Sequence, residues 1–265
     1  MNEKMPVLFI GHGSPENIML DNSFTRSLSA LGKSLPQPTG IMVISAHWLT
    51  SGTFVTCMER PRTIYDFYGF PKELYEMTYP SPGGPEEASI AIKTVRKTAV
   101  KCDMNWGLDH ASWAVLKHMY PRANIPVFEM SLDYSFNEWH PKPVQYHYDL
   151  ASELSELRVR GVLIIGSGNI VHNLGMLDFE NIDAEPFDWA AEFDEKVRAN
   201  LLNGNHRDLI HYPNMGQTST LAVPTLDHYL PMIYAVALQG ENEPLTFVHE
   251  GFQYGSISMR CFQIG

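Results

Sequence analysis

Four short and almost wholly apolar runs recur along the chain, and longer segments with the spacing of amphipathic helices separate them. The runs cover residues 7–10, 41–44, 127–130 and 162–165. A strand that is apolar on both faces is typical of a parallel sheet covered by helices on both sides. The pattern therefore predicts an α/β fold, with a central, mostly parallel sheet flanked by helices on both faces.

The spacing of apolar residues, and the residues that end helices and strands, predict the remaining elements. Helices are expected at residues 23–35, 86–100, 112–119, 143–157, 187–202 and 226–238. Further strands are expected at residues 54–58 and, as a closing pair, at 246–248 and 254–260. No linker or repeat divides the chain, so we expect a single domain over residues 1–265.

Charge and cysteine content exclude several classes of function. Lys and Arg number 19 and Asp and Glu 30, a net charge of −11. With no basic cluster, the chain is not expected to bind nucleic acid or anionic membranes. No run approaches the roughly 20 apolar residues of a membrane span, which predicts a cytoplasmic protein. Cys57, Cys102 and Cys261 are far apart, so neither a disulfide framework nor a cysteine zinc site is expected.

Three histidines follow expected strands after small residues. His12 lies just after residues 7–10, His47 just after 41–44, and His172 a few residues after 162–165. In open α/β sheets the ligand crevice lies at the carboxyl ends of the strands. If the three strands are parallel neighbours, three imidazoles converge on one crevice.

Two further histidines stand at the junctions of loops and helices. His110 and His228 each follow an aspartate, Asp109 and Asp227. A neighbouring carboxylate can orient an imidazole, although Asp227 is better interpreted as a helix N-cap. The other six histidines have no supporting context and are expected to be ordinary surface or core residues: His118, His140, His147, His206, His211 and His249.

Several neutral imidazoles in one crevice are typical of a catalytic metal site. Imidazole binds Zn, Fe, Cu and Ni through its unprotonated nitrogen, and three ligands leave coordination positions open. A fourth histidine beside the metal can ligate it or transfer protons. Other chemistries lack their motifs, because the chain has no G-x-S-x-G nucleophile elbow, no P-loop and no G-x-G-x-x-G.

Taken in order, several motifs together resemble a known family. They are Gly11-His12-Gly13-Ser14-Pro15, Ser45-Ala46-His47-Trp48, Tyr65-Asp66-Phe67-Tyr68-Gly69-Phe70-Pro71, Gly107-Leu108-Asp109-His110, Gly168-Asn169-x-x-His172-Asn173 and Gly255-Ser256-Ile257-Ser258-Met259-Arg260. The set, which spans residues 6–260, resembles the class III extradiol ring-cleavage dioxygenases and within them the 4,5-DOPA dioxygenase branch.

The resemblance implies a non-haem Fe(II) enzyme that opens a catechol ring beside its two hydroxyls. It makes His12, His47 and His228 metal ligands, His172 an acid–base catalyst or a further ligand, and His110 a contact to substrate or oxygen. The best-known ring-cleavage sites use two histidines and a carboxylate, whereas here His228 stands where that carboxylate is expected. Ala111 stands where the family pattern has a glycine.

For a catechol such as L-DOPA, the resemblance implies consumption of dioxygen and formation of a ring-opened semialdehyde acid. Zinc cannot carry out this redox step, yet it binds nitrogen-rich sites more tightly than Fe(II). We therefore expect Fe(II) to support activity and Zn(II) to occupy protein purified in air. The natural catechol is left open, as is the partner of a substrate carboxylate, and a homo-oligomer is possible.

Two other functions remain as alternatives. A zinc-dependent hydrolase would use the same histidines to activate water, although the chain has no His-Glu-x-x-His motif. A non-enzymatic binding protein could retain the fold and the histidines. The aromatic-rich stretch at residues 65–79 is equally compatible with a wall that stacks on the substrate ring and with a hydrophobic cluster under a loop.

Overall fold

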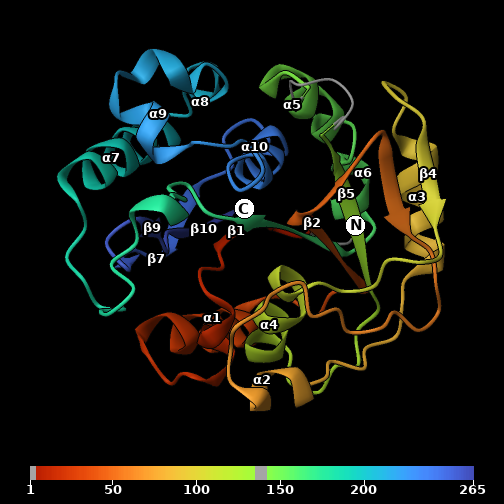
Figure 1. Ribbon diagram of the computed structural model, residues 1–265. Coiled ribbons are helices and arrows are strands. Elements are labelled where there is room, and N and C mark those ends of the chain that lie inside the picture. Colours follow the sequence, from red (N-terminus) through yellow and green to blue (C-terminus); the bar gives the residue numbers. More distant parts are fainter. Residues whose placement is uncertain (1–3, 135–141) are drawn as a thin grey trace.

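An eight-stranded sheet forms the centre of the computed structural model, which describes residues 4–134 and 142–265 (Figure 1). Its strand order is β4-β3-β5-β2-β6-β1-β10-β7, and a small second sheet pairs β8 with β9. The strands are β1 (Val7–Gly11), β2 (Gly40–Thr50), β3 (Thr53–Thr56), β4 (Val100–Asp103), β5 (Val127–Asp133), β6 (Val162–Gly168), β7 (Leu245–His249), β8 (Phe252–Gln253), β9 (Ile257–Ser258) and β10 (Cys261–Ile264).

The four apolar runs of the sequence form the parallel middle of this sheet. Strands β5, β2, β6 and β1 pair in parallel, with Ile41 opposite both Val127 and Leu163, and Val7 opposite Ile164. Antiparallel strands β10 and β7 extend the β1 edge, and β3 pairs antiparallel with β5 at the other side. The predicted α/β fold with a mostly parallel sheet is confirmed.

Helices cover both faces of the sheet. They are α1 (Ser23–Ser34), α2 (Lys72–Glu76), α3 (Pro85–Thr94), α4 (His110–Met119), α5 (Val144–Ser152), α6 (Ser155–Val159), α7 (Asp188–Leu202), α8 (His206–Ile210), α9 (Thr218–Ala222) and α10 (Leu230–Ala237), with 3-10 turns η1 (Pro15–Met19), η2 (Leu174–Met176) and η3 (Tyr212–Met215). Helices α1, α2 and α4 lie below the sheet in Figure 1, and α5, α7, α8, α9 and α10 lie above it.

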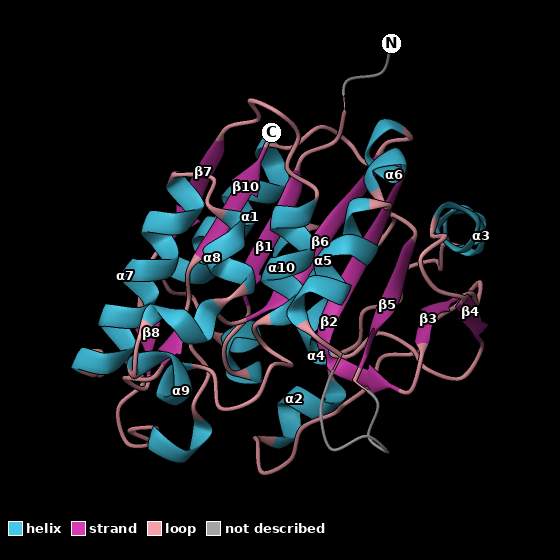
Figure 2. Ribbon diagram, turned by 90° about the horizontal axis from the view of Figure 1, so that it is seen from above, coloured by secondary structure: helices cyan, strands magenta, loops and turns pink. Residues whose placement is uncertain are grey.

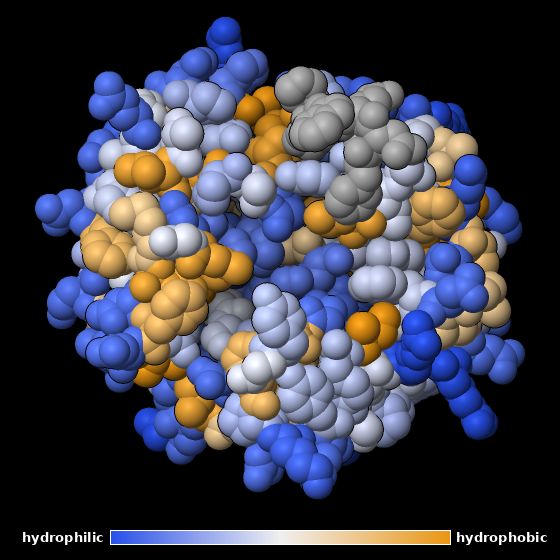
Figure 3. Space-filling model, viewed as in Figure 1, coloured by the Kyte–Doolittle hydropathy of each residue, from blue (hydrophilic) through white to orange (hydrophobic). Residues whose placement is uncertain are grey.

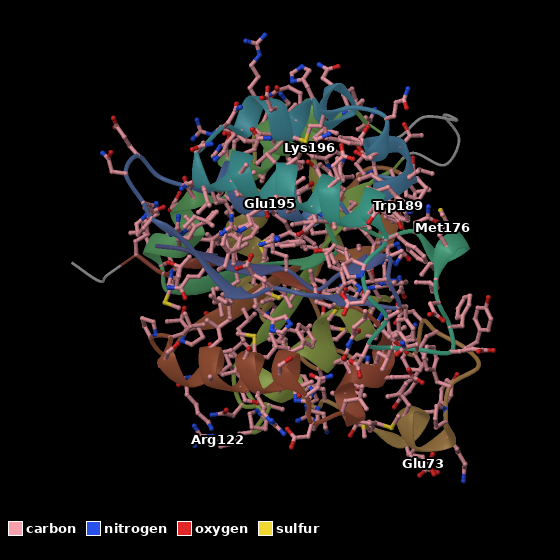
Figure 4. The ribbon with its side chains drawn as sticks, turned by 90° about the vertical axis from the view of Figure 1, so that its left-hand side faces the viewer. Glu73, Arg122, Met176, Trp189, Glu195 and Lys196 are labelled. Atoms are coloured by element: carbon pink, nitrogen blue, oxygen red, sulfur yellow. A yellow bond between two sulfur atoms is a disulfide. The ribbon has the colours of Figure 1, made fainter. Side chains whose placement is uncertain are left out.

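Alternating side chains of the central strands supply the two cores. In β1, Val7 and Phe9 pack into the core under α5, α7 and α10, whereas Leu8 and Ile10 pack into the core over α1 and α4. Figure 2 shows the strands side by side with helices before and behind them. Figure 4 shows the same layering edge-on, with Glu195 and Lys196 of α7 above the sheet and Glu73 of α2 below it. Burial on both faces explains why these strands are apolar throughout.

Several predicted elements differ in extent. The helix expected over residues 86–100 ends at Thr94, and Val100 begins β4 instead. The amide groups of Arg96 and Lys97 donate to the Glu153 carboxylate, which replaces the hydrogen bonds of another helical turn. The helix expected over 143–157 is divided into α5 and α6. The closing strand expected at 254–260 contains only the short strand β9, and the strand that pairs with β7 is β10, which begins at Cys261.

The cysteines also differ from expectation. Cys57 and Cys102 form a disulfide beside the β3–β4 pair, with their Cα atoms 5.7 Å apart, while Cys261 is free and buried. No disulfide framework was expected, and the structure has one disulfide at this edge of the sheet. The two residues are 45 positions apart in the sequence, and the parallel pairing of β3 and β4 brings them together.

Within residues 4–134 and 142–265, no helix has the length and apolar character needed to cross a membrane.

Candidate active site

Three neighbouring strands bring their carboxyl ends together beneath a cluster of histidines. Parallel pairing places Gly11, the last residue of β1, opposite Gly168, the last residue of β6. His12 follows Gly11, and its amide donates to the Gly168 carbonyl at 3.1 Å. His47 lies within β2, where the register with β5 is interrupted between Ile44 and Leu49. Figure 3 shows a hydrophilic hollow bordered by hydrophobic residues near the middle of the face drawn in Figure 1.

Side-chain nitrogens of His12, His47 and His228 form a compact group. One nitrogen from each lies within 4.8 Å of the others, and the Nε2 atoms of His12 and His47 are 3.2 Å apart. Two nitrogens that each lie about 2.1 Å from one ion, at 90–109° to each other, are separated by about 3.0–3.4 Å. The spacing observed is therefore that of two ligands on one metal ion.

Hydrogen bonds at the Nδ1 atoms determine which nitrogen of each ring is free. The Ser167 hydroxyl donates to the Ala111 carbonyl, so its oxygen accepts the Nδ1 proton of His12 at 3.1 Å. Nδ1 of His47 lies 3.2 Å from Asp66, and Nδ1 of His228 lies 2.9 Å from Asp227. The three Nε2 atoms are left with lone pairs. A divalent metal such as zinc or iron fits this donor set.

Nε2 of His228 strengthens this conclusion. It is buried and has no hydrogen-bond partner within the part of the chain that the structure describes. An orphaned buried polar atom costs about 1–3 kcal/mol unless something binds it. Two lone pairs that face each other 3.2 Å apart, on His12 and His47, are likewise unfavourable without a shared cation. The unpartnered nitrogens of His12, His47 and His228 therefore favour a bound cation.

Burial keeps two of the ligand candidates in the neutral form that binds metal. Burial, followed by the nearby His228, lowers the pKa of His12 well below its ordinary value. Burial, followed by the nearby His110, lowers the pKa of His47 in the same way. Neutral imidazoles at physiological pH need no deprotonation before they coordinate.

His172 stands beside this group and is not one of its three members. Its ring stacks on that of His228, with centroids 3.4 Å apart and planes 8° apart. Its amide donates to the Ala222 carbonyl, which fixes the backbone after β6. Burial and then His228 lower its pKa well below the ordinary value, while Asp227 opposes this shift. His172 thus lies against one member of the group without belonging to it.

His110 lies at the first residue of α4, on the other side of the group. Its ring centroid is 4.2 Å from that of His47 and 5.4 Å from that of His12. Its Nδ1 lies 2.8 Å from one oxygen of Asp66, and its amide donates to the other oxygen at 2.9 Å. Four predicted histidines and His110 are thus assembled at one place. His140 lies outside the described residues, and the other five histidines are not members of this group.

Asp66 is the functional residue that sequence reasoning did not single out. It lies between β3 and α2, and its carboxylate bridges Nδ1 of His47 and Nδ1 of His110. Burial raises its pKa, but the hydrogen bond and charge of His110 outweigh this effect, and the pKa of Asp66 is lowered. His47, Asp66 and His110 also meet the spacing of a second metal-ligating group. Because their atoms already share hydrogen bonds, they form an orienting network.

The aspartates that precede His110 and His228 differ in role. Asp227 accepts a hydrogen bond from His228 and therefore orients it, whereas its interpretation as an N-cap is wrong because α10 starts at Leu230 after Tyr229. Asp109 does not orient His110. Its carboxyl is fully buried near Glu129, and burial raises the pKa of Asp109 well above the usual range. Burial likewise raises the pKa of Glu129 to about 7.

The aromatic stretch reaches the site through one ring. Phe67 packs edge-on against His110, with centroids 5.6 Å apart, and also contacts Phe70, Tyr75 and Trp113. The Tyr65 hydroxyl donates a hydrogen bond to the Met77 carbonyl and so links the two ends of this segment. The stretch is therefore a hydrophobic cluster that presents one aromatic wall beside the histidines.

Arg260 is buried and held by Asp194, so it is not free to meet a substrate carboxylate.

Comparison with known proteins agrees with this architecture. Residues 6–260 match the LigB family, described as the catalytic LigB subunit of aromatic ring-opening dioxygenase. The chain is 44% identical to 4,5-DOPA dioxygenase extradiol of Escherichia coli K12 over 99% of this chain and 95% of that protein. It is 34% identical to 4,5-DOPA dioxygenase extradiol of Beta vulgaris over 96% of this chain and 94% of that protein.

A solved structure shares the whole fold. The crystal structure of an uncharacterized protein from Escherichia coli K12 superposes with a TM-score of 0.84 and 40% sequence identity, covering 99% of this chain and 100% of that one. The family is metal-dependent, which agrees with the cluster of unpartnered imidazole nitrogens. The chain belongs to the LigB family of aromatic ring-opening dioxygenases and is an extradiol dioxygenase.

Proposed function

We propose that residues 1–265 form one catalytic domain that opens the ring of a catechol such as L-DOPA by 4,5-cleavage, with dioxygen as co-substrate and a semialdehyde acid as product. One observation carries the proposal: the imidazoles of His12, His47 and His228 bring ring nitrogens close together at the carboxyl ends of the sheet. Two relatives that carry the name 4,5-DOPA dioxygenase extradiol support the substrate class.

His12, His47 and His228 are proposed to hold the metal, with Fe(II) as the ion that supports activity. When bound, Fe(II) supplies a redox centre that a catecholate and dioxygen can both reach, whereas Zn(II) has no accessible second oxidation state. An all-nitrogen set does not select against zinc. We therefore expect protein purified in air to contain zinc and to be inactive until iron replaces it.

His172 and His110 are proposed to handle protons and orientation. A neutral His172, with its lowered pKa, can accept a proton from a catechol hydroxyl and return it later in the reaction. His110 is fixed by Asp66 through Nδ1, which leaves its Nε2 edge for substrate or oxygen. Phe67, edge-on to His110, places an aromatic ring beside the histidines, where it can contact the ring of a substrate.

The proposal is tested by anaerobic reconstitution with Fe(II), followed by addition of air and L-DOPA. We expect oxygen uptake equal to the yellow ring-opened product formed. His12→Ala should abolish both and lose bound iron, whereas His206→Gln, a histidine bonded to Tyr148 and Gln239 away from the site, should retain both. If the enzyme cleaves other catechols but not L-DOPA, the reaction class stands and the substrate is a different catechol. Iron-loaded protein that consumes no oxygen with any catechol would contradict the proposal and favour a zinc hydrolase.

A further inference from the structure

A small cavity lies directly behind the histidine cluster, between η1, α1 and α4. Its volume of about 10 Å³ is close to the space that one water-sized molecule needs. His12 and His110 of the histidine cluster contribute to its wall. Most of the remaining wall is apolar and includes Ile18, Leu28, Ala114 and Val115.

Two polar residues of the wall, Asn17 and His118, direct their hydrogen-bonding groups to other protein atoms. The Asn17 amide nitrogen donates to the carbonyls of His12 and Ser14 and to the side chain of Gln253. Nε2 of His118 donates to the Asn17 carbonyl at 3.0 Å. A buried water needs two to four polar partners, and cavities without them stay dry yet accept apolar guests such as xenon. This cavity is therefore suited to a small apolar molecule.

His118 also separates the cavity from solvent. The same side chain lines a second, open pocket of about 490 Å³ on the molecular surface, beside Thr25, Ser29 and Lys33 of α1. A small molecule that passes His118 would thus enter from the α1 side. It would reach the rings of His12 and His110 without crossing the hydrophilic hollow at the carboxyl ends of the strands (Figure 3).

We propose that this cavity is a binding site for dioxygen, reached past His118 and separate from the entrance of the aromatic substrate. Dioxygen is small and apolar and loses almost no hydrogen bonding on leaving water, so a dry apolar cavity holds it better than it holds water. A separate approach lets dioxygen arrive after the catechol fills the hollow. The inference rests on the ring-opening activity only because that activity uses dioxygen.

The first test needs no turnover. Zinc-loaded protein, which is diamagnetic, is labelled at its methyl groups, and relaxation caused by dissolved paramagnetic dioxygen is measured by NMR. We expect stronger enhancement at the methyls of Ile18, Leu28 and Val115 than at equally buried Leu154 and Val197 in the opposite core. Equal enhancement in the two groups would overturn the proposal. This result is independent of which catechol is the substrate.

Variants then connect the cavity to catalysis. Ala114→Val fills the cavity and should weaken the enhancement and raise the KM for dioxygen roughly tenfold, with the KM for catechol unchanged. Ala191→Val, at a half-buried alanine of α7, should change neither. His118→Ala should enlarge the passage and increase the enhancement at Ile18 and Leu28, and an unchanged value would overturn the route. If Ala114→Val changed the KM for catechol and left the KM for dioxygen unchanged, the assignment of the cavity to dioxygen would be overturned.

Discussion

The imidazole ring of His172 lies flat against that of His228, with the ring centroids 3.4 Å apart. Two rings in such contact do not both carry a positive charge, because like charges at this distance repel strongly. Burial and the proximity of His228 together keep the pKa of His172 below its usual range. Burial and His228 thus favour the neutral form of the His172 ring.

This relationship predicts the pH–rate profile. The iron-loaded enzyme should keep its kcat down to a pH below 6.5 and lose activity only as His172 becomes protonated. His172→Gln should lower kcat by about 10²–10⁴-fold and flatten that acidic limb while iron stays bound. Stopped-flow rates between pH 5 and 8, with iron content measured in parallel, check this expectation. Loss of iron from the variant would instead identify His172 as a ligand.

Asp66 and Asp227 should control metal affinity without touching the ion. Each accepts the Nδ1 proton of a ligand histidine, and removal of such a partner typically costs about 10–100-fold in metal affinity. Asp66→Asn and Asp227→Asn should therefore weaken zinc binding by about that factor in competition titrations. Asp21→Asn, which removes only an exposed pair with Arg26, should bind as the unaltered protein does.

Metal binding should resist acid more than an exposed three-histidine site does. A histidine of ordinary pKa near 6.5 is mostly protonated at pH 5.5, which costs about 1.4 kcal/mol per ligand. The pKa values of His12 and His47 are lowered, so protons begin to compete only at lower pH. Zinc affinity should thus fall little between pH 7.5 and 6. A tenfold loss over that interval would show that the two histidines titrate normally.

Glycine at position 168 is required for the placement of His228. A Cβ atom added to Gly168 would lie 2.2 Å from the backbone oxygen of His228, which cannot give way without moving the residue. Gly168→Ala should destabilise the fold by about 1–3 kcal/mol and weaken metal binding together. Gly175→Ala, where the added Cβ would meet only the Asn173 side chain at 3.3 Å, is the control. Urea unfolding and zinc titration measure the two effects.

A buried ion pair ties α7 to the last strands. Asp194 accepts hydrogen bonds from Ser258 at 2.6 Å and from Nε of Arg260 at 3.0 Å, and both charged side chains are buried. Removing one partner leaves the other charge poorly paired, so Asp194→Ala should cost about 3–5 kcal/mol of unfolding free energy. Glu192→Ala, on the exposed side of the same helix, should cost less than about 1 kcal/mol. Comparable losses in both variants would contradict this account.

The sequence was sufficient for the parts of the site that depend on strand ends. His12 and His172 could be placed because apolar runs predict neighbouring parallel strands, and the crevice follows from that topology. Asp66 could not be placed, because it belongs to a segment without periodicity whose position is set by packing around Phe67 and Trp113. The Cys57–Cys102 pair was missed because strand β4, which carries Cys102, was not predicted: the expected helix ended at residue 100, and no element was expected over the next residues.

Strand β1 lies between β6 and β10, so Val7 faces Ile164 on one side and Ile264 on the other. Both neighbours are distant in sequence, and contacts of this kind form late because closing long loops costs entropy first. Strand β1, which leads to His12, is therefore held on both sides only once β6 and β10 have both paired with it. The position of His12 thus depends on two distant parts of the chain, so the histidine cluster takes its final geometry only when the middle of the sheet is assembled.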